Sequence, residues 1–195
     1  RNPIDFYYQK ILKIKDRNEV EETVAANTLG TVVHNTLEDF YKPLVGQILT
    51  IEIIKQLRSE IDNRVTHHFK NEYKEGDIKT GKNLIIYEIA KRYVSNFLDY
   101  ETNSINSGNS IKIIAIEADN QVSVNIPELG FPIFLKGKVD RVDEYNGVTR
   151  IIDYKTGSVQ QNQIEIINWE ALTTDYKKYS KSFQVLSYAY MMHKS

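Results

Sequence analysis

The chain has 195 residues and a formal net charge of −1, with 41% hydrophobic and 26% charged residues. These values are typical of a globular protein and predict one domain with a substantial core. A nearly neutral chain excludes an overall basic character, so any surface that binds nucleic acid must be local.

Two further absences in the sequence restrict the function classes. No stretch approaches the roughly 20 consecutive apolar residues of a membrane-spanning helix, so no membrane partner is expected. The sequence has no cysteine, which excludes disulfides, a thiol nucleophile and thiolate metal sites. Both observations favour a cytoplasmic location.

The first half of the chain has the apolar spacing of amphipathic helices. Thr28 is the expected N-cap of one helix, on which His34 and Glu38 lie four residues apart and share a face. The adjacent His67 and His68 diverge by about 100° on a helix, which favours structural roles over metal binding. The predicted helices cover residues 3–15, 29–44, 51–73 and 82–101, with a loop at 74–81.

After a polar loop at 103–110 the apolar period changes to two, which predicts strands at 111–119 and 121–126. Pro127 begins the expected turn, and Phe131 starts the next strand. Glu117 lies in the first strand, where it either faces a site or is a solvated edge carboxylate. A closing helix is predicted from about residue 180 to the end, with Gln184 and Tyr188 on one face.

Residues 135–157 read LKGKVDRVDEYNGVTRIIDYKTG, which has the form of a β-hairpin with its turn at Asn146-Gly147. Side chains alternate along a strand, so Asp153 and Lys155 are expected on one face and Tyr154 on the other. Asp140, on the partner strand, is expected beside Asp153. Two carboxylates and a lysine favour a site for a hard cation such as Mg²⁺. A surface salt bridge of Lys155 remains the alternative for Asp-x-Lys alone.

Four motifs follow one another in the chain: Gly30 with His34, Leu37 and Glu38; Gly137 with Asp140, Arg141 and Asp143; DYKTG at 153–157; and Gln184 with Tyr188. Together they resemble the PD-(D/E)xK nuclease superfamily, and within it the RecB- and AddB-type nuclease domains. The resemblance implies an α/β, restriction-endonuclease-like core with a mixed central β-sheet flanked by helices. One domain, 1–195, is expected, with a helical part at about 1–105 and a sheet core and closing helix at about 111–195. We expect it to be a fragment of a longer protein.

The resemblance implies a Mg²⁺- or Mn²⁺-dependent deoxyribonuclease, an exonuclease module of a helicase–nuclease system for DNA repair and recombination. Its partners would be DNA and a helicase subunit or fused helicase-like region. A nuclease fold that only binds DNA, and a sugar- or nucleotide-binding sheet domain, are the alternatives.

The implied metal ligands are Asp140, Asp153, the Tyr154 carbonyl and His34, with Glu38 and Glu117 as further candidates. Lys155 would orient the nucleophile and stabilise negative charge in the transition state. Gln184 and Tyr188 would contact the substrate or support Lys155.

Residues 3–15 (PIDFYYQKILKIK) resemble the opening of AddB-like members, where a preceding cysteine is one of four ligands of an iron–sulfur cluster. Asn2 occupies that position here, and no cysteine occurs elsewhere. A cysteine-ligated cluster is therefore excluded on chemical grounds.

Overall fold

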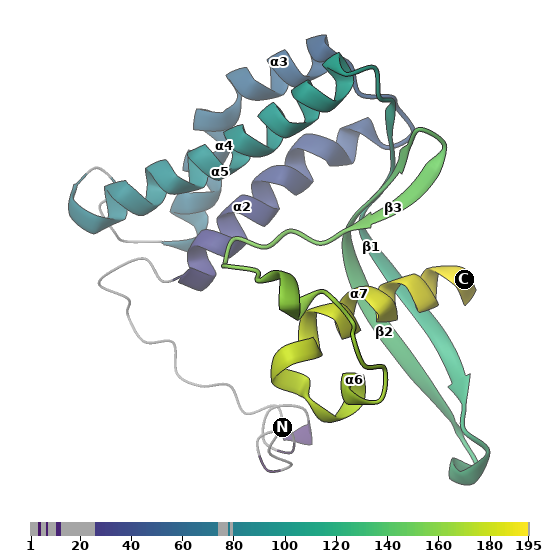
Figure 1. Cartoon of the computed structure of the whole chain (residues 1–195). Coiled ribbons are helices and arrows are strands. Elements are labelled where there is room, and N and C mark those ends of the chain that lie inside the picture. Colours follow the sequence, from purple (N-terminus) through teal and green to yellow (C-terminus); the bar gives the residue numbers. More distant parts are fainter. Residues whose placement is uncertain are drawn as a thin grey trace.

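The computed structural model describes residues 26–73, 78 and 80–194, together with residues 4, 7, 11 and 12. The helix predicted at 3–15 falls outside its continuously described part. A layer of helices occupies one end of the molecule and a long sheet crossed by one helix occupies the other (Figure 1). The helices are α2 (Ala26–Tyr41), α3 (Ile51–Ser59), α4 (Ile61–Glu72), α5 (Gly81–Asn106), α6 (Ala171–Thr174) and α7 (Tyr176–Lys194). The strands are β1 (Ile111–Asn125), β2 (Pro132–Tyr145) and β3 (Val148–Ile152), and short 3-10 turns are η2 (Lys42–Leu44), η3 (Pro127–Leu129) and η4 (Gln161–Gln163).

The helical half departs from the predicted boundaries in three places. Because α2 begins at Ala26, Thr28 lies inside its first turn and is not the predicted N-cap. The single helix predicted at 51–73 is two helices, which are separated at Glu60. Thr50 caps the first of them, since its side chain accepts a hydrogen bond from the Ile53 amide. α5 continues to Asn106, past its predicted end at 101.

One core joins these helices to the sheet. It contains apolar residues from α2, α4 and α5 and from the start of β1: Val32, Val33, Leu37, Phe40, Val65, Phe69, Ala90, Val94, Leu98, Ile111 and Ile113. All of them are buried. This packing holds α2 beside the end of β3, where the sequence motifs converge.

The sheet has the order β1-β2-β3, and both pairings are antiparallel. The expected α/β class with a helical N-terminal half is confirmed, but the described sheet is antiparallel and not mixed. The two strands predicted at 111–126 form one strand, because Asp119 and Asn120 stay paired with Lys138 and Gly137 across the hairpin. The predicted turn is confirmed, with positive φ at Asn146 (51°) and Gly147 (84°).

The closing helix α7 begins at Tyr176, earlier than predicted, and crosses the sheet (Figure 1). Tyr188 and Met191 pack with Val139 and Val142 of β2 in a second apolar cluster. Among the helices of the described part, none has the length and apolar character needed to cross a bilayer.

Candidate functional site

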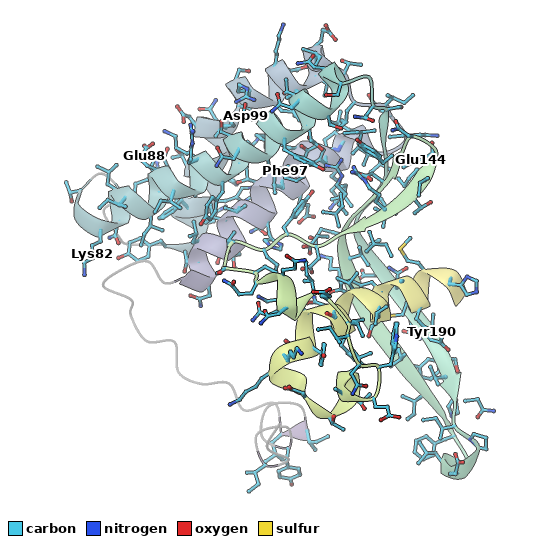
Figure 2. The ribbon with its side chains drawn as sticks, in the orientation of Figure 1. Lys82, Glu88, Phe97, Asp99, Glu144 and Tyr190 are labelled. Carbon is cyan, nitrogen blue, oxygen red and sulfur yellow. The ribbon has the colours of Figure 1, made fainter. Side chains whose placement is uncertain are left out.

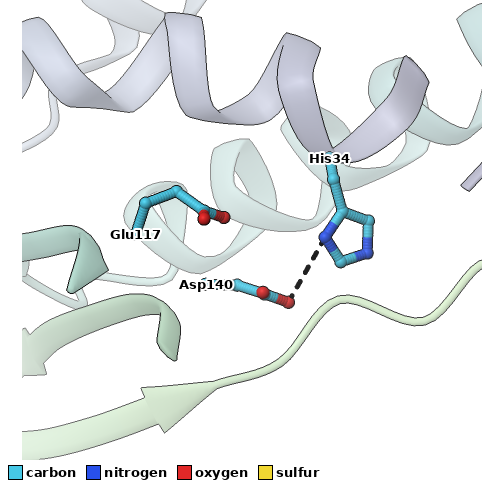
Figure 3. Close-up of side chains that lie close together, drawn as sticks. All are labelled: His34, Glu117 and Asp140. Carbon is cyan, nitrogen blue, oxygen red and sulfur yellow. Dashed lines mark ion pairs between the residues drawn. The ribbon is translucent and has the colours of Figure 1, made fainter. Parts of the chain in front are cut away.

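Glu117 has an unusual backbone conformation in the middle of β1. Its φ is +51°, in the left-handed region that residues other than glycine rarely adopt. The strand pairing passes from Ile116 opposite Arg141 to Ala118 opposite Val139, so Glu117 stands across from Asp140. Backbone strain of this kind costs about 1–3 kcal/mol and is concentrated at functional sites. Here it accompanies a carboxylate that points toward Asp140 and α2 (Figure 3).

His34 reaches from α2 to the segment that follows β3. Its Nε2 lies 2.8 Å from the Tyr154 carbonyl oxygen, and its Nδ1 lies 3.5 Å from Asp140 Oδ2. In the neutral tautomer that donates from Nε2 to the carbonyl, the lone pair of Nδ1 faces Asp140. The hydrogen bond with Asp140 raises the pKa of His34 above its usual value; the charge of Asp140 and the Tyr154 carbonyl add to this, while burial and Lys155 oppose it.

His34, Glu117 and Asp140 form the cluster of possible metal ligands. One ligand atom from each lies within 4.8 Å of the other two (Figure 3). The amide of Tyr154 donates to Asp140 Oδ2 at 2.6 Å, which fixes the orientation of that carboxylate. One imidazole nitrogen with two carboxylates suits a divalent cation that accepts both nitrogen and oxygen.

Asp153 and Lys155 lie directly after β3 and form an ion pair. The β2–β3 pairing ends with Arg141 opposite Ile152, so Asp140 and Asp153 are the next facing positions. Asp153 is nevertheless outside the three-residue cluster described above. Its carboxylate contacts Lys155 and accepts a hydrogen bond from Gln184.

The QxxxY pair of α7 is joined to this segment. Gln184 Nε2 donates to Asp153 Oδ1 at 3.2 Å and to the Tyr188 hydroxyl at 2.7 Å. Helix α7 thus holds Asp153 in place from the side of the sheet opposite the Tyr154 ring. That ring is buried and packs edge-on against Phe97, with the ring centroids 5.2 Å apart, as expected for a core side chain.

Three other predicted residues lie apart from the cluster. Glu38 forms an ion pair with Lys42 at 3.0 Å and is outside the group of ligand atoms. His68 Nε2 contacts Asp39 at 2.8 Å, and His67 contacts Asn71, which agrees with the structural roles predicted for both histidines.

Arg141 and Asp143 of the second motif belong to a buried ionic network. Arg141 donates to Glu101 at 2.6 Å and to Asp143 at 2.7 Å, and its guanidinium lies 4.5 Å from the Tyr41 ring centre. Arg150 makes two hydrogen bonds to the same aspartate. The network ties α5 to β2 and β3 directly behind the site.

Sequence reasoning missed Glu101. A signal for it was present, because Glu101 continues the buried stripe of α5 formed by Ala90, Val94 and Leu98. It also missed Lys138, whose Nζ lies 2.5 Å from a carboxylate oxygen of Glu117. Lys138 precedes Asp140 by two residues, and alternate residues of a strand share a face.

One hollow, of about 640 Å³, lies between α5 and residues 152–158. Val33, Phe97 and Tyr100 line it together with Tyr154, so it is on the core side of the segment. Of the residues that the structure describes, none from α7 lines this hollow.

Known proteins resemble this chain over most of its length. The family model described as the PD-(D/E)XK nuclease superfamily matches residues 1–195. A Clostridium perfringens protein, named as a subunit of an ATP-dependent helicase/deoxyribonuclease, is 33% identical over 179 residues, 80% of this chain and 14% of that protein. A Clostridioides difficile protein of the same name is 29% identical over 185 residues, 84% of this chain and 15% of that protein. An uncharacterised Rickettsia conorii protein is 23% identical over 177 residues, 85% of this chain and 19% of that protein.

The chain thus spans only 14–15% of the length of the two clostridial relatives. The family model, in contrast, covers it from end to end. The chain belongs to the PD-(D/E)XK nuclease superfamily.

Proposed function

We propose that this chain is a metal-dependent deoxyribonuclease module that hydrolyses DNA phosphodiesters with Mg²⁺ or Mn²⁺. The observation that carries the proposal is the continuity of the site. His34 contacts both Asp140 and the Tyr154 carbonyl, and the same short segment continues to the Asp153–Lys155 ion pair. The ligand groups and the lysine therefore come from three parts of the fold: helix α2, strand β2 and the segment that follows β3.

The residues fit a divalent cation. Two carboxylates of the cluster, Glu117 and Asp140, stand on facing positions, and a cation between them would relieve the repulsion that Lys138 and the Tyr154 amide offset only in part. His34, Glu117 and Asp140 would hold the ion, with Asp153 and the Tyr154 carbonyl as further oxygen donors nearby. A cation bound there would neutralise charge on the scissile phosphate and favour ionisation of an attacking water.

The chain's own side chains supply the remaining functions. Lys155 carries a positive charge beside Asp153, where it would donate to a phosphate oxygen and stabilise charge that develops during hydrolysis. Gln184 holds Asp153 from α7, so the carboxylate is oriented before substrate binds. Tyr188 in turn accepts a hydrogen bond from Gln184 and supports it.

The clostridial relatives are named as helicase/deoxyribonuclease subunits, which supports a helicase partner or a fused helicase-like region for this chain. We propose that it acts in the cytoplasm as the exonuclease module of such a system in DNA repair and recombination. The alternative, a fold that binds DNA without cutting it, has less support because Asp140, Asp153 and Lys155 are all present and adjacent.

Incubation of the purified chain with end-labelled linear DNA and with closed circular DNA, in Mg²⁺, Mn²⁺ or EDTA, tests the proposal. We expect linear DNA to be shortened from its ends with either metal, circular DNA to survive, and EDTA to stop the reaction. DNA binding without cleavage in any condition would favour the non-catalytic alternative. Cleavage in EDTA would refute metal dependence.

A further inference from the structure

One ligand carboxylate of the proposed metal site is paired with a lysine. Lys138 Nζ lies 2.5 Å from Glu117 Oε2, and Glu117 is one of the three residues whose ligand atoms come together. The other carboxylate, Asp140, contacts the Tyr154 amide and the His34 ring. Among the described residues, Lys138 is thus the one permanently charged cation that is paired with a member of this group.

Lys138 reaches Glu117 along the face of β2 that carries Asp140. Alternate residues of a strand share a face, and Lys138 precedes Asp140 by two positions. A Cβ atom on Gly137, the residue between Lys138 and Lys136, would meet Met191 of α7, so α7 covers the opposite face at this point. The lysine therefore stands on the side of the sheet where His34 of α2 approaches Asp140.

The two partners of this ion pair differ in exposure. The side chain of Lys138 is 52% exposed, whereas that of Glu117 is 16% exposed. Within the described ranges, Glu117 is the one carboxylate with which Lys138 forms an ion pair. The ammonium can therefore leave Glu117 by rotation of its own side chain, without disturbing packed residues. A lysine that leaves such a pair also regains rotamer freedom.

Lys155 has a different relation to the cluster. Its partner, Asp153, lies outside the group of three ligand residues. A cation held by that group need not disturb the Asp153–Lys155 pair, but it needs the carboxylate of Glu117. A divalent cation and an ammonium on one carboxylate repel each other, and the ammonium carries the smaller charge. Of the two lysines, Lys138 is thus the one that a bound cation would displace.

We propose that Lys138 is a counter-ion built into the metal site, which pairs with Glu117 until a divalent cation displaces the ammonium into solvent. Lys138 competes with the cation for Glu117 and so lowers the affinity of the site. In return, it offsets the repulsion between the facing carboxylates when no cation is bound. This inference rests on the proposed function, because it takes His34, Glu117 and Asp140 as the ligands, and it adds how metal binding there is regulated.

Calorimetric titration with Mn²⁺ in about 0.15 M salt, without DNA, tests the competition. Lys138→Met should raise the Mn²⁺ affinity about two- to five-fold, the range that corresponds to the loss of a partly exposed ion pair. Lys138→Arg keeps the charge and should bind as the wild type does. In a Glu117→Gln background, Lys138→Met should gain little, because the carboxylate for which the two cations compete is gone.

Two further lysines serve as matched controls. Lys136→Met removes a lysine from the same face of β2, two residues farther from Asp140. Lys82→Met removes one at the far end of α5 (Figure 2). Exposed charges more than about 8 Å away are largely screened at this ionic strength, so both variants should bind Mn²⁺ as the wild type does. Circular dichroism checks that each variant is folded.

Chemical labelling of lysines reports the displacement itself. The wild type is treated with an amine-reactive succinimidyl ester in EDTA or in saturating Mn²⁺, and peptide mass spectrometry follows each lysine. An ammonium held by a carboxylate reacts slowly, so Lys138 should be labelled faster with Mn²⁺ than with EDTA. Labelling of Lys82 should be the same in both conditions.

Every other outcome overturns the inference. If the wild type binds Mn²⁺ but Lys138→Met leaves the affinity unchanged or lowers it, or if labelling of Lys138 does not respond to Mn²⁺, the lysine is not displaced. The nuclease proposal then stands on its cleavage assay. If Lys136→Met raises the affinity as much as Lys138→Met does, the effect is one of general charge and the inference is wrong. If the wild type binds no Mn²⁺, the inference fails, and the cleavage assay decides whether the proposed function fails with it.

Discussion

Gly137 and Met191 lie so close that a Cβ atom at position 137 would stand 2.5 Å from Met191 Cε. The Tyr188 ring would be 3.1 Å from the same Cβ. This glycine is therefore what allows α7 to approach β2 and to bring Gln184 to Asp153.

The first prediction concerns this contact. Gly137→Ala should lower the free energy of unfolding by about 1–3 kcal/mol, because the added methyl overfills the β2–α7 interface. Met191→Ala opens space at the same place, so the double variant should be more stable than the sum of the two single effects implies. Urea denaturation of the wild type, the two single variants and the double variant measures these effects. Strictly additive losses of unfolding free energy would argue against a direct clash.

The second prediction concerns the buried ionic network. Arg141→Met removes the cation shared by Glu101 and Asp143 and should cost about 3 kcal/mol or more, since it leaves a buried carboxylate without its partner. Arg58→Met breaks an exposed pair with Asp99 and should cost about 1 kcal/mol or less. Equal losses in urea denaturation would contradict the assigned role of the network.

The third prediction concerns metal binding. Calorimetric titration with Mn²⁺ should show affinity reduced about ten-fold or more in both His34→Ala and Glu117→Gln, because each change removes a ligand group. His67→Ala and Glu144→Gln change the same residue types elsewhere and should have little effect. Wild-type affinity in the His34 variant would remove that residue from the proposed site.

The fourth prediction concerns pH. The raised pKa of His34 means that the metal-free folded protein holds its proton more tightly than the unfolded chain does. The resulting stability is complete below the ordinary value of 6.5 and is lost as the pH rises through the raised value. A cation needs the unprotonated ring, so the affinity for Mn²⁺ should increase over that same rise.

His34→Gln should flatten both pH profiles. Thermal unfolding without metal and Mn²⁺ titration, each measured between about pH 6 and pH 8, provide the comparison. A steep affinity profile that persists in the variant would mean that another group titrates.

Local sequence patterns correctly predicted those features of the fold that depend on a few neighbouring residues. The hairpin turn at Asn146-Gly147 needed positive φ, and these residue types tolerate it. The break at Glu60 was missed because the apolar spacing continues across it, from Ile54 to Ile61 and Val65, all of which are buried. The division of β1 was wrongly predicted because polar Asp119 and Asn120 resemble a turn, whereas their backbones stay in the long hairpin.

At the site, too, local patterns predicted only relationships between residues that are close in the sequence. Side-chain alternation predicted Asp153 and Lys155 together and Tyr154 in the core. The ion pair and the buried ring are present, although β3 ends at Ile152 and these residues lie beyond the strand on which the prediction placed them. The proximity of His34 to Asp140 followed from resemblance to a family, since no local rule joins residues so far apart in sequence. The left-handed backbone of Glu117 was not predictable, because it arises where the β1–β2 pairing is interrupted.

The measurement that tests the central claim most directly is metal-dependent cleavage of linear DNA by Lys155→Ala and Asp153→Ala. Loss of charge stabilisation at the phosphate should lower the rate about a hundred-fold or more in each, with the fold retained by circular dichroism. Lys82→Ala should cleave at the wild-type rate. Undiminished cleavage by either purified variant would contradict the assignment of the Asp153–Lys155 pair as the catalytic centre.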